Sequence, residues 1–120
     1  VLSFGTAGAS LSHSDIADAT TTVASSATTV LNTFAVGTYR SAKYFISIVD
    51  ATNGRYEIVE ANVTHDGSDA YISTFGSTTN YTGPLTTFSA DVSGGNARVL
   101  VTNISDNSTV FKFQAIYIDV

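Results

Sequence analysis

Short segments rich in β-branched and aromatic residues follow one another along most of this chain, and their apolar residues recur at every second position. Alternation with a period of two is typical of β-strands, and segments this short leave little room for helices. The segments span residues 28–36, 42–51, 56–65, 69–76, 85–93, 96–103 and 109–120. The fold class is therefore predicted to be all-β.

The connections between these segments carry residues that favour tight turns. Four pairs supply positive φ angles or polar turn side chains, namely Asn53-Gly54, Asp66-Gly67, Gly94-Gly95 and Asp106-Asn107. The single proline, Pro84, lies in a longer polar loop, where it removes no ladder hydrogen bond. Strands joined mostly by hairpins predict an antiparallel β-sandwich of jelly-roll-like form, and the sequence leaves the strand order open.

The chain of 120 residues has the length of one domain with one hydrophobic core. Residues 6–29 are small, polar and weakly periodic, and we expect residues 1–18 to form a flexible N-terminal arm or linker before a β-sandwich domain over residues 19–120. The arm begins with an isolated apolar patch of Val1, Leu2 and Phe4. We expect this patch to act in assembly by adding a strand to a neighbouring subunit.

The small share of charged residues, and the excess of acidic over basic ones, limit the kinds of molecule that the chain can bind. Only 12% of the residues are charged, and the formal net charge is −5. Such a chain repels phosphate backbones and anionic lipid surfaces, so neither nucleic acid nor a membrane is expected as a partner. The absence of cysteine excludes disulfides, thiolate nucleophiles and zinc-thiolate sites.

The sequence contains no recognisable catalytic constellation. Neither His13 nor His65 stands at a metal-ligand spacing, and we expect His65 to be a polar turn residue. No G-x-S-x-G elbow is present. Glu57 and Glu60 have opposite strand parity, so they make a poor acid/base pair and are expected to face solvent. The protein is therefore predicted not to be an enzyme, and no cofactor is expected.

Three aspartates in predicted loops and strand ends are weak candidates for a Ca²⁺ site. Asp66, Asp69 and Asp91 would supply carboxylate oxygens if the fold brought them together. The favoured interpretation is that they are turn residues that accept backbone hydrogen bonds. No other metal site is predicted.

Two features indicate contact between subunits. The last segment is apolar on both faces, with Ile116 and Ile118 on one of them, so it is either central in the domain or covered by a neighbouring subunit. Arg40 and Lys43 lie at the entry to the segment TYRSAKYFISI. We expect these two basic side chains to pair with the three aspartates across a sheet end or a subunit boundary.

Glycan binding is an alternative function, because exposed tyrosine rings can stack on sugars. Tyr39, Tyr71 and Tyr81 are the candidates, although packing within the sheets is favoured for tyrosines in strands. Four N-glycosylation sequons would carry sugars only in a secreted protein; they begin at Asn62, Asn80, Asn103 and Asn107.

Several of these stretches together resemble a repeat-type β domain of virion structural proteins in tailed bacteriophages, especially those of marine cyanobacteria. The similarity covers about residues 19–120. It rests on the order of the motifs Tyr39-Arg40-Ser41-Ala42-Lys43-Tyr44, His65-Asp66-Gly67, Ala70-Tyr71, Phe88, Asp91, Gly94-Gly95-Asn96 and Arg98.

The resemblance implies a virion component, as in tail fibres, head appendages or capsid decoration. We accordingly expect a non-enzymatic structural protein that forms a symmetric homo-oligomer, with a trimer favoured, and that contacts other virion proteins. The alternatives are an adhesion module that binds a host-surface glycan, and a subunit of an extracellular filament whose N-terminal arm donates a strand.

Overall fold

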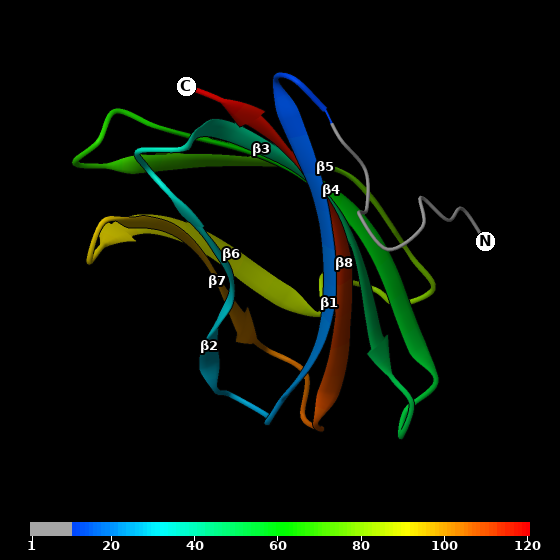
Figure 1. Ribbon diagram of the computed structural model, residues 1–120. Helices are drawn as coiled ribbons and strands as arrows, with labels where there is room; N and C mark the ends of the chain where they lie inside the picture. Colours follow the sequence, from blue (N-terminus) through cyan, green and yellow to red (C-terminus); the bar gives the residue numbers. More distant parts are fainter. Residues whose placement is uncertain (1–10) are drawn as a thin grey trace.

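The computed structural model describes residues 11–120, which form eight β-strands and no helix (Figure 1). No helix in this part of the chain could therefore span a membrane. The strands are β1 (Ser14–Val23), β2 (Thr28–Ala35), β3 (Tyr39–Asp50), β4 (Arg55–His65), β5 (Ala70–Thr79), β6 (Thr86–Ser93), β7 (Asn96–Asn103) and β8 (Thr109–Asp119).

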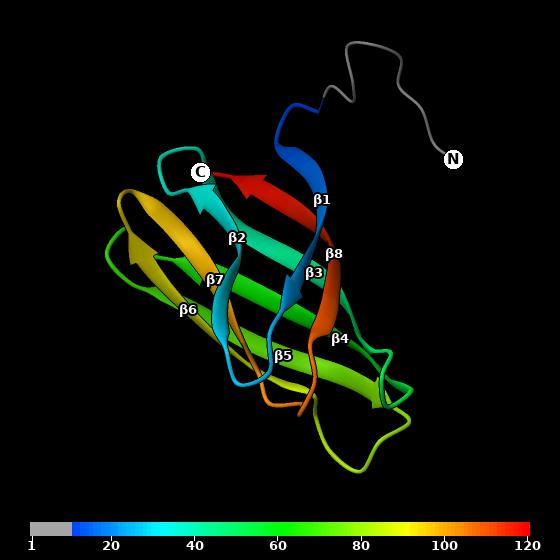
Figure 2. The same cartoon turned by 90° about the horizontal axis from the view of Figure 1, so that it is seen from below.

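The strands form two antiparallel sheets that pack face to face (Figures 1 and 2). The large sheet has the order β1-β8-β3-β4-β5, and the small sheet has the order β2-β7-β6. The connections β1–β2, β2–β3, β5–β6 and β7–β8 cross from one sheet to the other. These findings confirm the predicted all-β antiparallel sandwich and supply the strand order.

The core lies between the two sheets and is built from one face of each strand. In β3 the buried hydrophobic side chains are those of Ala42, Tyr44, Ile46 and Ile48, as the alternation predicts. β8 contributes Phe111, Phe113, Ala115 and Tyr117, and β7 contributes Ala97, Val99 and Val101. The residues between these positions point away from the core.

One amide links the two layers through the core. A β-bulge in β2 shifts the register between Val30 and Asn32. Asn32 Nδ2 donates hydrogen bonds to the hydroxyls of Tyr44, at 2.9 Å, and Tyr117, at 2.5 Å, both in the large sheet. Desolvation by burial raises the pKa of both phenols.

The N-terminal region is more regular than expected. β1 crosses the boundary placed between residues 18 and 19, because Ser14–Val23 pair with β8 along the whole strand. Residues 14–18 therefore belong to the large sheet. The patch of Val1, Leu2 and Phe4 lies outside the described residues, and its role in assembly stays a prediction.

Two polar residues of β4 are buried: Glu57, which was expected to face solvent, and His65, which was expected to be a polar turn residue. Glu57 accepts hydrogen bonds from Ser77 Oγ at 2.5 Å and from the backbone N–H of Leu85 at 2.9 Å. His65 contacts the carbonyl oxygen of Tyr39 through Nε2 at 2.6 Å, and its Nδ1 accepts from the N–H of Gly67 at 3.0 Å. Both residues are buried because partners from other segments satisfy their polar atoms.

Candidate assembly surface on the outer face of the large sheet

The face of the large sheet that points away from the small sheet, called the outer face below, is unusually apolar. Seven of the twelve exposed large hydrophobic side chains in residues 11–120 project from it: Ile16, Phe45, Tyr56, Ile58, Tyr71, Phe75 and Ile118. The strand faces of the small sheet expose only Val30 from the same set. Single exposed apolar residues are ordinary, but seven on one sheet face make that face a candidate interaction surface.

A row of large side chains crosses the middle of the outer face. Register places Phe75 of β5 beside Glu60 of β4, and Glu60 beside Phe45 of β3. Lys43 Nζ lies 5.3 Å from the ring centroid of Phe75 and 5.6 Å from that of Phe45, and 3.3 Å from Glu60 Oε1. We call these four residues the aromatic row. The positive charge of Lys43 is paired within the subunit with the carboxylate of Glu60.

A shallow groove of about 550 Å³ lies beside this row, and we call it the outer groove. Small polar residues occupy its middle, with Ser41 of β3 hydrogen-bonded to Thr64 of β4 at 3.0 Å. Larger residues lie around them, namely Lys43, Tyr71, Ile116 and Ile118. The predicted assembly residues Lys43, Ile116 and Ile118 are thus brought together at one site, and Arg40 lies outside its lining.

Arg40 and Lys43 have partners other than the predicted ones. Arg40 Nη1 donates to the backbone oxygen of His65 at 3.1 Å, at a register shift of β3 against β8. Lys43 pairs with Glu60. Within the described part of one subunit, neither side chain forms an ion pair with the three aspartates named as candidates.

The three aspartates do not form a cluster in the described residues. Asp66 Oδ1 accepts hydrogen bonds from the N–H groups of Asp69 and Ser68, at 2.8 and 2.9 Å, and these bonds lower the pKa of its carboxyl group. Asp91 forms two hydrogen bonds with Arg98, at 2.7 and 2.6 Å, which lower its pKa likewise. The turn role is confirmed for Asp66, whereas Asp91 lies in a cross-strand ion pair.

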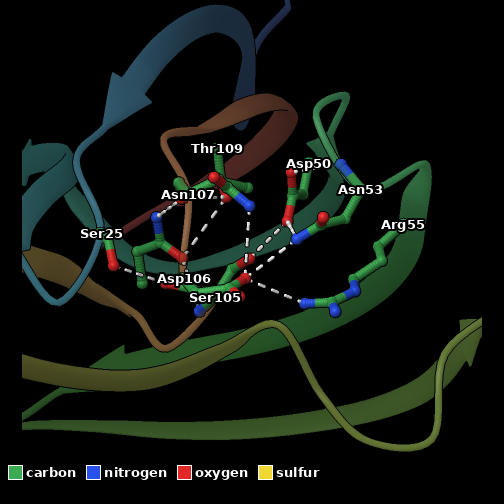
Figure 3. Close-up of polar contacts among 9 residues, drawn as sticks. Ser25, Asp50, Asn53, Arg55, Ser105, Asp106, Asn107 and Thr109 are labelled. Carbon is green, nitrogen blue, oxygen red and sulfur yellow. Dashed lines mark hydrogen bonds and ion pairs between the residues drawn. The ribbon is translucent and has the colours of Figure 1, made fainter.

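A polar cluster, shown in Figure 3, joins the β3–β4 loop to the β7–β8 loop at one end of the sandwich. Asp50, at the end of β3, is fully buried and accepts hydrogen bonds from Ser105 Oγ at 2.5 Å and from the N–H of Asn53 at 3.2 Å. Asn53 Nδ2 also donates to Asp106 Oδ1 at 2.9 Å, and Arg55 pairs with the same oxygen at 3.2 Å. The cluster joins two loops, and its buried side-chain polar atoms all have hydrogen-bond partners, as do those of the rest of residues 11–120.

Asn103 extends this cluster to a third segment. Its Nδ2 donates to the carbonyl oxygens of Val23 at 2.9 Å and Asn107 at 2.8 Å, and its Oδ1 accepts from the N–H of Ser105. The side chain is fully buried. This sequon asparagine is therefore structural in the folded chain, and we assign the cluster a stabilising role.

The three tyrosines named as sugar-stacking candidates have different environments. Tyr39 packs on Tyr117 with ring centroids 4.9 Å apart, and its hydrogen bond to Asp15 raises its pKa to about 12. Tyr81 lies against the guanidinium of Arg55, 4.0 Å from its ring centroid. Tyr71 is 55% exposed at the outer groove, with its hydroxyl donating to Asp66.

Sequence reasoning missed five of the seven exposed apolar residues of the outer face, namely Ile16, Phe45, Tyr56, Ile58 and Phe75. The sequence does contain a signal for this face: in several strands both the odd-numbered and the even-numbered positions hold apolar residues, as in residues 44–49 and 56–59. The signal supports an oligomer in several strands, but it yielded named assembly residues only in the last one. A comparison of both faces of every strand would have predicted a covered outer face.

Comparison with known proteins gave likenesses in solved structures only, since no family model and no curated protein match the sequence. The tailspike protein of Acinetobacter baumannii phage AM24 is 12% identical with a TM-score of 0.49, over 88% of this chain and 26% of the tailspike chain. The tailspike of Acinetobacter phage vB_ApiP_P1 is 16% identical with a TM-score of 0.43, over 98% of this chain and 24% of that chain.

A third likeness is to a tailspike of Acinetobacter baumannii bacteriophage Fri1, described as a capsular polysaccharide depolymerase. It is 16% identical with a TM-score of 0.42, over 89% of this chain and 20% of that chain. A depolymerase is an enzyme, so this finding contradicts the prediction that the protein is not an enzyme, and that prediction is withdrawn. This chain spans about a quarter or less of each tailspike, all three from Acinetobacter phages, and is similar to parts of them in fold.

Proposed function

We propose that this chain is a structural module of a phage virion protein of the tail type, held in place by packing its outer face against a neighbouring subunit. The observation that carries the proposal is the concentration of exposed apolar side chains on that face. Burying such side chains contributes about 25 cal/mol per Å² of apolar surface removed from water. The motif resemblance over residues 19–120 supports the virion location. The proposed assembly is a symmetric homo-oligomer, with three copies favoured.

A double substitution on the outer face tests this proposal. Ile58→Lys with Ile118→Lys places two charges on the apolar surface without disturbing the core, because both side chains are about half exposed. The variant is expected to keep the melting temperature of the wild type and to lose assembly in sizing and in pull-downs with other virion proteins. Val30→Lys, on the small sheet, is the matched control and should assemble normally. A wild-type chain that is monomeric and binds no virion protein would refute the proposal.

A second candidate function is glycan binding at the outer groove. It is favoured by the exposed ring of Tyr71 beside the polar side chains of Ser41, Asn62 and Thr64. An aromatic face with neighbouring hydroxyl and amide groups suits a sugar ring. Glycan-array binding that Tyr71→Ala abolishes would support this function, and an array without any bound glycan would exclude it.

A further inference from the structure

The charges on the outer face differ from those of the whole chain. Both lysines of the sequence, Lys43 and Lys112, project from this face. Only two of the ten acidic residues, Asp18 and Glu60, do so. The outer face is therefore neutral in a chain of formal net charge −5, so two such faces can approach without the repulsion that other surfaces would cause.

Two of these four charges lack a partner within the subunit. Lys43 pairs with Glu60, whereas neither Lys112 nor Asp18 has an opposite charge within 4.0 Å among residues 11–120. Asp18 of β1 lies opposite Gln114, and Lys112 of β8 lies opposite Thr20, so both are on one side of the sheet.

These two charges lie around a hollow with apolar walls. The hollow has a volume of about 280 Å³, and Phe45 and Ile58 line it together with Asp18 and Lys112. Apolar walls with one charge of each sign suit a partner that presents apolar side chains and the same two charges. The outer face of a second copy presents that set.

We propose that the outer face of each copy packs against the outer face of the next copy around the symmetry axis of the oligomer, with Lys112 of each copy paired with Asp18 of the next. The inference rests on the proposed function and names the partner of its surface. Apolar burial supplies the affinity, and the charge pair favours one register, since registers that bring Lys112 against Lys112 or Asp18 against Asp18 are repulsive. Nucleic acid and anionic membranes are unsuited to this face, because it carries no excess positive charge.

Charge reversal tests the pairing. Asp18→Lys and Lys112→Asp each place like charges in contact between copies, and each is expected to weaken self-association about tenfold or more in sedimentation equilibrium. The double variant Asp18→Lys with Lys112→Asp exchanges the two charges, so opposite charges again face each other between copies. Its association constant should lie within about threefold of that of the wild type. Asp69→Lys, an exposed loop change that alters the net charge as Asp18→Lys does, should have no effect.

Mixing the two single variants separates an effect on contact from an effect on folding. A mixture contains opposite charges between unlike copies, so it should associate more tightly than either variant alone. Failure of both the double variant and the mixture to recover association would overturn the inference, as would a wild-type chain that stays monomeric. If that monomeric chain still binds other virion proteins and loses them on Ile58→Lys with Ile118→Lys, the role as a virion module with a covered outer face stands, and the homo-oligomer is excluded together with this inference.

Discussion

The hydroxyl of Ser105 donates a hydrogen bond of 2.5 Å to Oδ2 of Asp50, which joins the β7–β8 loop to the end of β3. Both residues are buried, and 55 positions separate them in the sequence. A hydrogen bond to a buried carboxylate stabilises a fold more than a neutral surface bond does, because the charge has little water to replace the lost donor. This bond therefore determines much of the stability at that end of the sandwich.

Ser105→Ala is expected to lower the free energy of unfolding by about 1–3 kcal/mol, the usual cost of removing a donor from a buried charged group. Chemical denaturation monitored by tyrosine fluorescence measures the change. Ser108→Ala, an exposed position in the same loop, should lower it by less than about 0.5 kcal/mol. Equal effects at the two positions would contradict the role assigned to the bond.

Acid should destabilise the fold through carboxylates whose pKa is lowered. Hydrogen bonds from Ser105 to Asp50, from backbone N–H groups to Asp66 and from Arg98 to Asp91 lower these pKa values below the ordinary 3.8. A lowered folded pKa contributes stability that is complete above the unfolded pKa and is lost as the pH falls through the folded pKa. The melting temperature should therefore vary little with these groups above about pH 5 and fall below about pH 4.

Replacing one of these carboxylates isolates its share of the acid effect. Asp91→Asn removes a titrating group while it leaves the amide oxygen to face Arg98. The variant should be less stable than the wild type at pH 7, and the difference should shrink as the pH falls below about 4. Melting curves recorded from pH 7 to pH 2 test this, and a difference that is constant with pH would contradict it.

The strands and core positions were predictable because they depend on local alternation. The inward residues Tyr44, Ile46 and Ile48 follow from period two alone, whichever strands lie beside them. β1 was not predicted as a full strand because its small, polar residues give little alternation. Pairing with β8 along its length, a contact distant in sequence, stabilises it.

The candidate surface depended on information that local pattern does not contain. Lys112 and Asp18 become neighbours only because β1 pairs with β8, and the aromatic row exists only because β4 lies between β3 and β5. The burial of Glu57 likewise depends on Ser77 and Leu85, which lie 20 and 28 positions away. Strand order brings these residues together, and the sequence left that order open.

Asn32 is expected to be the most sensitive polar position between the two sheets. Asn32→Ala removes the donor shared by the Tyr44 and Tyr117 hydroxyls and leaves space in the interior. The free energy of unfolding should fall by about 2–4 kcal/mol, as for other buried polar groups that lose their partners. Urea denaturation measures the loss. Thr33→Ala, the exposed neighbour in β2, is the control and should cost less than about 0.5 kcal/mol.

Arg40→Ala tests whether the positive charge at the start of β3 acts within the subunit or between subunits. Within the subunit its guanidinium donates one bond, to the backbone oxygen of His65, and the residue is exposed. Loss of that bond alone should lower the free energy of unfolding by about 0.5–1.5 kcal/mol and leave self-association unchanged. A larger loss of assembly than of stability would instead place Arg40 at a subunit contact, as the sequence predicts. Thermal melting and sedimentation of the same sample separate the two results, and a variant that melts and assembles like the wild type would exclude both roles.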